Sequence, residues 1–168
     1  MVTEYQVIPA TPADAPVILQ MARGLAEYER MPGAVTATED DIRRTLFEEP
    51  RRAEAAIGYS AGVPAGIVVF FHTYSTFLGR PGIYLEDIYV EESHRGRGLG
   101  RVLMQYVAQI AVERGCARFE WAVLDWNQPA IGFYEKLGAR PQSDWTVYRL
   151  AGEALLQLAS NAPPERAP

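Results

Sequence analysis

The chain has 168 residues, of which 48% are hydrophobic and 22% are charged, and its formal net charge is −5. This length predicts one domain with a substantial core, and the acidic balance argues against nucleic acid as a partner. The single cysteine, Cys116, excludes an internal disulfide framework and fits a reducing cytoplasm. We expect neither a signal peptide nor a membrane span, since no suitable apolar run occurs. The isolated His72 and His94 predict no metal site.

The first half of the chain predicts two helices and three strands. A strand is expected at residues 5–8, and a helix follows through residue 28, with Thr11 as its N-cap and Pro12 as its first residue. Thr38 caps a second helix with acids in its first turn, and Pro50 stops it. Two strands, 53–60 and 66–74, are expected around a turn at 61–64, with a loop over 75–82.

The second half predicts alternating strands and helices. The expected elements are a strand at 83–90, a helix at 99–114 ended by Gly115, a strand at 118–124, a helix at 128–137 ended by Gly138, a strand at 145–150 and a helical segment at 153–159. Residues 161–168 hold three prolines and are expected to form a frayed tail. The order predicts an α/β fold, in one domain over 1–160, with a mixed, strongly twisted sheet covered by helices.

The most informative segment is the glycine-rich loop between the strand at 83–90 and the helix at 99–114. Glycines allow close approach of the backbone, and a helix N-terminus offers unpaired N–H groups, so this loop predicts a phosphate site. A Walker A loop needs Lys-Ser/Thr, whereas Arg101-Val102 follows here. A dinucleotide-binding loop needs the spacing G-x-G-x-x-G, whereas the spacing here is G-x-G-x-G. Such a fold also needs an acidic residue about 20 residues further on, and Glu120 lies near that position. The dinucleotide interpretation is weakened because no repeated βαβ unit precedes the loop. A helix-opening turn without a ligand is the simplest alternative.

Residues 95–100, Arg-Gly-Arg-Gly-Leu-Gly, resemble the R/Q-x-x-G-x-G/A acetyl-CoA pyrophosphate loop of the GNAT superfamily of N-acetyltransferases. Residues 84–90, 122–127 and 133–139 resemble segments of its diamine (spermidine/spermine) and thialysine acetyltransferase branch, and the resemblance covers roughly residues 5–158. It implies a GNAT-type α/β fold whose fourth and fifth strands splay apart to admit acetyl-CoA. It also implies a homodimer that transfers acetyl from acetyl-CoA to a primary amine of a small molecule (a diamine, polyamine or lysine analogue) in a ternary complex.

This reaction requires a neutral amine and a proton for the departing thiolate. Neutralising a lysine-like amine at pH 7 costs about 3.4 pH units, roughly 4–5 kcal/mol. The resemblance implies that Glu86 is the general base through water, that Asp87 lies near the substrate amine, and that Tyr134 protonates the thiolate. From the residues alone, the simpler interpretation is that Glu86 and Asp87 are solvated strand charges or helix partners and that Tyr134 is a packing residue.

The remaining candidates bind the two substrates. For acetyl-CoA the resemblance implies the loop residues, the backbone of the preceding strand, and two residues further on: Arg95, Gly96, Arg97, Gly98, Leu99, Gly100, Arg101, Ile88, Val90, Asn127 and Tyr134. Asn127 is also a good N-cap for the helix that follows it. The acceptor candidates, aromatic or acidic, are Tyr28, Glu29, Tyr74, Phe77, Glu86, Asp87 and Trp145.

The sequence departs from the polyamine enzymes at the acceptor side. Ser75 stands where they carry an acid, Phe77 where they carry a tryptophan, and only Ser143-Asp144 remains of the acidic segment before Trp145. Because a long polycation needs several spaced anions, a smaller amine is the better expectation. A catalytically silent acyl-CoA sensor and an acetyltransferase for a protein or peptide amine are the alternatives.

Overall fold

The computed structural model describes residues 5–160, so the expected tail at 161–168 lies outside the described residues. The chain divides into two compact units, unit 1 (residues 1–125) and unit 2 (residues 126–168). Unit 1 contains β1 (Tyr5–Pro9), η1 (Pro12–Asp14), α1 (Ala15–Tyr28), α2 (Glu39–Phe47), β2 (Glu54–Ser60), β3 (Val63–Ser75), β4 (Arg80–Val90), η2 (Glu92–His94), α3 (Leu99–Glu113) and β5 (Phe119–Trp121). Unit 2 contains α4 (Gln128–Lys136) and α5 (Gly152–Ser160).

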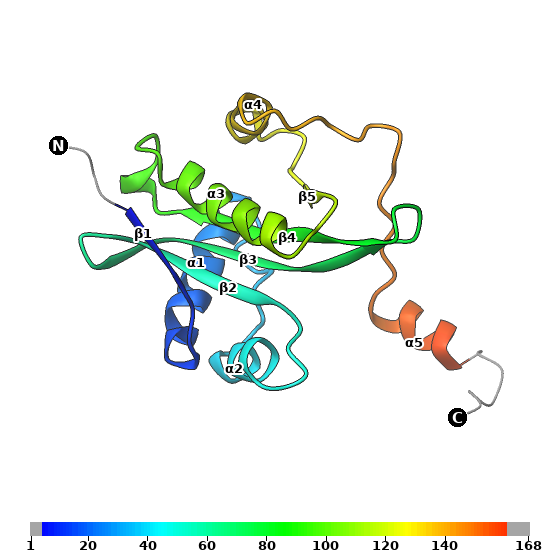
Figure 1. Cartoon of the computed structure of the whole chain (residues 1–168). Helices are drawn as coiled ribbons and strands as arrows, with labels where there is room; N and C mark the ends of the chain where they lie inside the picture. Colours follow the sequence, from blue (N-terminus) through cyan, green and yellow to red (C-terminus); the bar gives the residue numbers. More distant parts are fainter. Residues whose placement is uncertain (1–4, 161–168) are drawn as a thin grey trace. The chain divides into compact units, whose positions relative to one another are not determined.

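Unit 1 is built on a five-stranded sheet of order β1-β2-β3-β4-β5. Its neighbours are antiparallel except for β4 and β5, which run parallel, so the predicted mixed sheet is confirmed. Helices α1 and α2 cover one face and α3 covers the other (Figure 1). β5 pairs with β4 only at Ile83, Tyr84 and Leu85. The edge of β4 over residues 86–90 therefore has no strand beside it on that side, within the described chain.

Helix α3 is drawn tightly onto the sheet by glycines of β2 and β3. A side-chain carbon on Gly58 would lie 2.8 Å from Leu99, and one on Gly66 would lie 3.2 Å from both Leu99 and Leu103. Leu99 and Leu103 are fully buried above these glycines. Because the first turn of α3 rests directly on strand backbone, the start of the helix is held close to the open edge of β4.

A β-bulge in β4 decides which way its acidic residues point. Val69 of β3 is opposite Asp87, but the next residue, Phe70, is opposite Leu85, so Glu86 is an extra residue. A bulge reverses the alternation of side chains along its strand. Leu85 therefore faces the α3 side with Phe70, whereas Asp87 faces the α1 and α2 side with Val69. Without the bulge, Leu85 and Asp87 would share one face.

Several expected boundaries differ from the structure. The first helix opens as the 3₁₀ turn η1, where Thr11 and Asp14 form a capping box, before α1 begins. Strands β3 and β4 extend into the expected 75–82 loop, which shrinks to residues 76–79. The expected strand at 118–124 is formed only as β5.

The expected strand at 145–150 is wrong, because these residues have no regular structure, whereas the final helix is confirmed as α5. A strand needs a hydrogen-bonding neighbour, and the described part of unit 2 contains no other strand. Trp145 and Tyr148 are accordingly exposed. High local β-propensity at 145–150 was therefore not sufficient to form a strand.

Candidate active site

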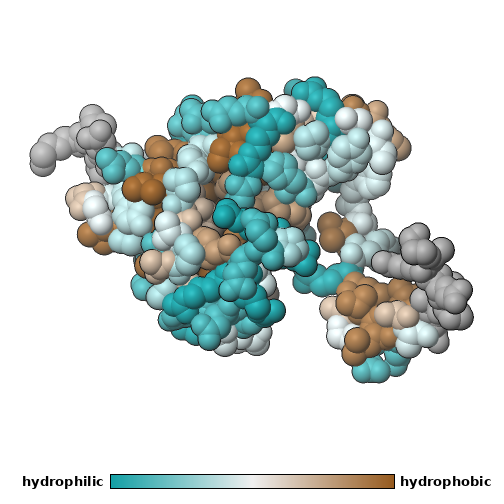
Figure 2. Space-filling model, turned by 60° about the horizontal axis from the view of Figure 1, so that its bottom comes forward, coloured by the Kyte–Doolittle hydropathy of each residue, from teal (hydrophilic) through white to brown (hydrophobic). Residues whose placement is uncertain are grey.

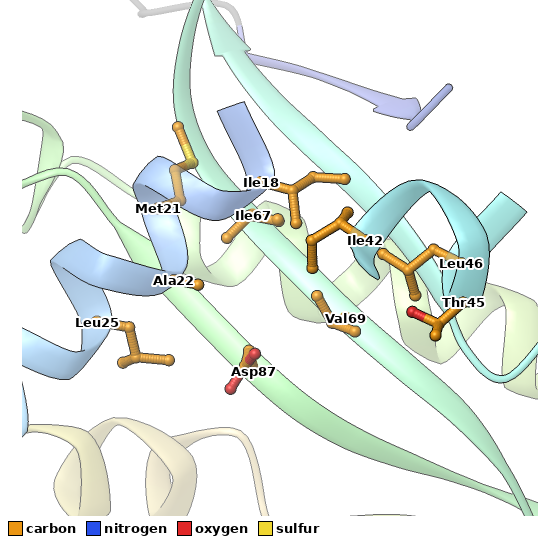
Figure 3. Close-up of a pocket in the computed structure, with 10 residues that line it drawn as sticks. All are labelled: Ile18, Met21, Ala22, Leu25, Ile42, Thr45, Leu46, Ile67, Val69 and Asp87. Atoms are coloured by element: carbon orange, nitrogen blue, oxygen red, sulfur yellow. The ribbon is translucent and has the colours of Figure 1, made fainter. Parts of the chain in front are cut away.

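Asp87 lies in the wall of a pocket between the sheet and the helices α1 and α2. The pocket has a volume of about 120 Å³, and Asp87 is its one charged lining residue (Figure 3). The others are Ile18, Met21, Ala22, Leu25, Ile42, Thr45, Leu46, Ile67 and Val69. An apolar pocket with one carboxylate suits a ligand that combines an alkyl chain with a cation.

The negative charges of two other carboxyl groups, Glu86 and Glu29, reach Asp87 at this pocket. Burial, together with the smaller effects of the negative charges of Glu86 and Glu29, raises the pKa of Asp87 to about 6. Burial also raises the pKa of Glu29, which follows the last residue of α1. Glu86 is exposed at the bulge. This accumulation of negative charge favours binding of a cation, which would relieve the repulsion.

The glycine-rich loop leaves the N-terminus of α3 without a side-chain cap among the described residues. Gly98 is the N-cap and adopts a φ of 97°, a left-handed conformation that favours glycine. The N–H groups of the first helical turn, from Leu99 on, therefore lack intrahelical acceptors and point outward with the positive end of the helix dipole. An ideal side-chain carbon on Gly96 or Gly98 would meet no atom within 4 Å in the described structure. The loop thus offers open space and donors to an anion.

The arginines of this loop differ in their partners. Arg97 and Arg101 are exposed, so their guanidinium groups can approach an anion bound at the loop. Arg95 instead turns back, and its Nε donates a hydrogen bond of 2.9 Å to the carbonyl oxygen of Val90. The side chain of Leu99 is fully buried, so only its backbone can serve a ligand.

The open edge of β4 presents backbone groups beside this loop. The amide of Glu91 donates to the carbonyl of Ala65, next to β3, so Glu91 faces that strand. Backbone direction alternates along a strand, and the pairing is regular from Asp87 to Val90. The N–H and C=O groups of Ile88 and the N–H of Val90 therefore point to the open edge, where the Val90 carbonyl already accepts the hydrogen bond from Arg95. A ligand with its own amides can pair there as an added strand would.

Some predicted site residues do not lie at this pocket. Tyr74 and Phe77 lie where β3 turns into β4, and both are well exposed. Tyr74 is five residues along β3 from Val69, the partner of Asp87, which corresponds to about 17 Å. Unit 1 alone thus brings the charges of Glu29 and Glu86 within reach of Asp87, with Tyr28 directly before Glu29, but it does not bring these two aromatic residues there.

The predicted residues of unit 2 lie on α4 and beyond it. Asn127 is the N-cap of α4, and its Oδ1 accepts a hydrogen bond of 3.3 Å from the amide of Ala130. Tyr134 is half-buried on α4, with its ring centroid 5.3 Å from that of Phe133. Trp145 is 79% exposed in the segment before α5.

The sequence did not single out the apolar residues of the pocket as site residues. Ile18, Met21 and Leu46 are buried in the hydrophobic core of unit 1, with Ile42 packed against them, and the same residues line this pocket. Periodicity reports which face of a helix is buried but not whether that face leaves a cavity. The usable signal was the pair of adjacent acids, Glu86 and Asp87, in the otherwise apolar segment 83–90.

The site combines an uncapped helix N-terminus, an open strand edge beside it, and carboxylates at an adjacent pocket. A chain with these features also matches a known protein family. The acetyltransferase (GNAT) family matches residues 20–139, and the chain belongs to this family. It is therefore an N-acetyltransferase, and the acetyltransferases of this family use acetyl-CoA. Among residues 5–160, no helix is long and apolar enough to cross a membrane.

Individual relatives indicate to which branch of the acetyltransferase family the chain is most similar. The chain is 37% identical over 161 residues to a thialysine N-epsilon-acetyltransferase of Sus scrofa, with 89% of this chain and 94% of the relative covered. It is 32% identical over 191 residues to the L-ornithine N5-acetyltransferase NATA1 of Arabidopsis thaliana, with 87% and 84% covered. In fold it is similar to an integron cassette protein from the mobile metagenome of V. cholerae, with a TM-score of 0.79 at 23% identity and 96% and 99% coverage. The thialysine match confirms the branch that the motifs indicated.

Proposed function

We propose that this enzyme acetylates a small primary amine whose cationic group is recognised by Asp87. The observation that carries the proposal is the half-buried carboxylate of Asp87 in an apolar pocket, with Glu86 and Glu29 close enough to raise its pKa. An alkylamine cation complements both properties, because its chain replaces water in the pocket and its charge relieves the repulsion among the carboxylates.

The residues of unit 1 fit acetyl-CoA as the donor. The N–H groups at the start of α3 and the exposed Arg97 and Arg101 suit a pyrophosphate, while the backbone of Ile88 and Val90 suits the amides of a pantetheine arm. Asn127 is proposed to bind that arm as well, in addition to capping α4. When bound, acetyl-CoA supplies an acetyl group activated as a thioester.

Glu86 and Tyr134 are proposed as the proton-transferring residues. Glu86 is exposed at the bulge, next to Asp87, where it can take a proton from the ammonium through water. Tyr134 is proposed to donate its phenolic proton to the departing sulfur. The support for Tyr134 is its match to the family segment at residues 133–139.

The acceptor is proposed to be a lysine-like amine or a diamine rather than a long polyamine. Relatives at 32–38% identity are named for thialysine and L-ornithine, both of which carry a terminal primary amine. The polyamine pattern is broken by Ser75 and Phe77. Within unit 1, Asp87 is the one acid that lines the pocket, and the charges of Glu86 and Glu29 reach it.

We propose that the whole chain acts as one catalytic domain in a cytoplasmic homodimer. Unit 2 supports the assembly, because it exposes apolar side chains before and along α5, where Figure 2 shows hydrophobic residues gathered. They include Trp145, Val147, Tyr148, Leu155, Leu156 and Leu158. Exposed apolar surface of this kind marks association sites. Light scattering at micromolar concentration should give the mass of two chains, and a monomer would contradict the proposal.

A panel assay tests the acceptor. Purified protein is incubated with acetyl-CoA and thialysine, lysine, ornithine, putrescine, spermidine or a lysine-containing peptide, and free thiol is measured. The proposal predicts the highest kcat/KM with an amine of the first four and the lowest with the peptide. Preference for the peptide would contradict the small-molecule assignment. Binding of acetyl-CoA with no turnover on any amine would indicate a sensor instead.

A further inference from the structure

The side chain of Arg95 connects the glycine-rich loop and the preceding strand β4 to the end of α1, which is distant in the sequence. Its guanidinium carbon is 4.6 Å from the ring centroid of Tyr28, the last residue of α1, and 5.5 Å from that of Tyr89 on β4. Its Nε donates to the carbonyl oxygen of Val90 at 2.9 Å. Both ring distances lie within the range of cation–π attraction. One arginine of the glycine-rich loop is thus attached to the end of α1 and to β4.

Tyr89 strengthens the connection between β4 and α1. A side-chain carbon on Gly24 of α1 would lie 2.7 Å from the phenolic oxygen of Tyr89, so this ring lies directly against the helix backbone. The hydroxyl of Tyr89 also donates to Glu91 at 3.3 Å. Tyr89 is 8% exposed and therefore fixed by its surroundings. The contacts with Tyr89 and Val90 on β4 therefore fix the position of the Arg95 side chain. Tyr28, the more exposed of the two tyrosines, is restrained by its contact with Arg95.

The direction of Arg95 separates it from its neighbours in the loop. Arg97 is exposed two residues further on and is free to approach a phosphate. The Nε of Arg95 donates to the carbonyl oxygen of Val90, and its guanidinium group lies over tyrosine rings. Its side chain therefore points to the side of β4 on which the Asp87 pocket lies, and not into the open space of the loop. Tyr28 precedes Glu29, one of the groups that raise the pKa of Asp87.

We propose that Arg95 is a positioning residue that couples acetyl-CoA binding to the order of the acceptor-binding end of α1. This inference rests on the proposed function, which places acetyl-CoA on the loop and the amine near Glu29. A ligand on the loop fixes the backbone of Arg95, and its guanidinium then restricts Tyr28 and the adjacent Glu29. Each substrate therefore raises the affinity of the enzyme for the other. The first substrate to bind loses the conformational entropy of ordering this region, and the second binds to a region that is already ordered.

Hydrogen exchange tests this coupling without requiring catalysis or knowledge of the acceptor. Coenzyme A is added to the wild type and to Arg95→Met, Tyr28→Leu and Tyr28→Phe variants, and exchange is followed over residues 24–31. The wild type and Tyr28→Phe, which keeps the ring face, should show slowed exchange when coenzyme A binds. Arg95→Met and Tyr28→Leu should bind coenzyme A without this slowing. Arg97→Met is the matched control: its affinity for coenzyme A should fall while exchange still slows at saturation.

Calorimetry supplies a second readout, which distinguishes failure of the proposed function from failure of the role of Arg95. With saturating thialysine, the Kd of coenzyme A should fall about two- to fivefold in the wild type, the range of one exposed cation–π contact, and stay unchanged in Arg95→Met. No binding of coenzyme A to the wild type would overturn the proposed function itself. Binding without slowed exchange at residues 24–31, or slowing that persists in both Arg95→Met and Tyr28→Leu, would overturn the role of Arg95 alone.

Discussion

Replacing Asp87 by asparagine should make the protein more stable at neutral pH while weakening acceptor binding. The pKa of Asp87 is raised from 3.8 to about 6 by burial and by the charges of Glu86 and Glu29. This rise is about two pH units, and each unit is worth about 1.4 kcal/mol, so the ionised carboxylate costs the native state about 3 kcal/mol. Asparagine has nearly the same shape and carries no charge, so the variant avoids this cost.

The sign of the effect follows from the direction of the pKa change. Between about pH 4 and pH 6, native Asp87 retains a proton that the unfolded chain has lost. The unfolding free energy of the wild type therefore falls as pH rises through this window, and the full deficit persists above it. The advantage of Asp87→Asn should be near zero at pH 4 and about 3 kcal/mol at pH 8.

Urea unfolding followed by circular dichroism at several pH values between 4 and 8 measures this difference. Glu48→Gln is the matched control, since Glu48 is an exposed carboxylate of unit 1 and its variant should stay within about 0.5 kcal/mol of the wild type. In steady-state kinetics, Asp87→Asn should raise the KM of the amine far more than that of acetyl-CoA. An Asp87→Asn variant no more stable than the wild type at pH 8, or a difference independent of pH, would refute the reasoning.

Three further predictions concern the donor site and proton transfer. Gly98→Ala should raise the KM of acetyl-CoA and lower the unfolding free energy by roughly 1–2 kcal/mol. Gly62, which has a similar positive φ of 78°, supplies the control: Gly62→Ala should lose the same stability and leave the KM of acetyl-CoA unchanged. Equal KM values for the two would remove the loop from the donor site. Tyr134→Phe should lower kcat by about 10²–10⁴-fold with KM for acetyl-CoA nearly unchanged, provided that chemistry limits the rate; full kcat would make Tyr134 a packing residue. Glu86→Gln should show a kcat/KM deficit that shrinks as pH rises toward the amine pKa, and a deficit constant with pH would exclude Glu86 as the base.

Local patterns were sufficient to predict the loop and the helix that follows it. The apolar stripe of α3 repeats every 3.6 residues, and Gly98 and Gly115 mark its two ends, so its bounds needed no information from distant residues. The strand that carries Glu86 and Asp87 was equally clear from its β-branched and aromatic residues. These two elements of the candidate site were therefore predictable.

The arrangement of the side chains was not predictable in the same way. Nothing in the residues around Glu86 announces an extra residue in β4, because the bulge is defined by its pairing with β3. The long side chain of Arg95 was expected near a phosphate, but its partners, Tyr28 and Tyr89, are set by the packing of α1 on the sheet. Residues 145–150 have strong β-propensity, but a strand also needs a partner, which propensity does not specify.

The central claim is that the chain transfers acetyl from acetyl-CoA to a small primary amine. The most direct measurement incubates purified protein with acetyl-CoA and thialysine, quantifies free thiol, and determines the acetylated product by mass spectrometry. The account predicts one N-acetylated amine for each thiol released, with the acetyl group on the terminal amine, and a rate that falls when Asp87 is replaced by asparagine. Thiol release without an acetylated amine, or acetylation that is indifferent to Asp87, would contradict it.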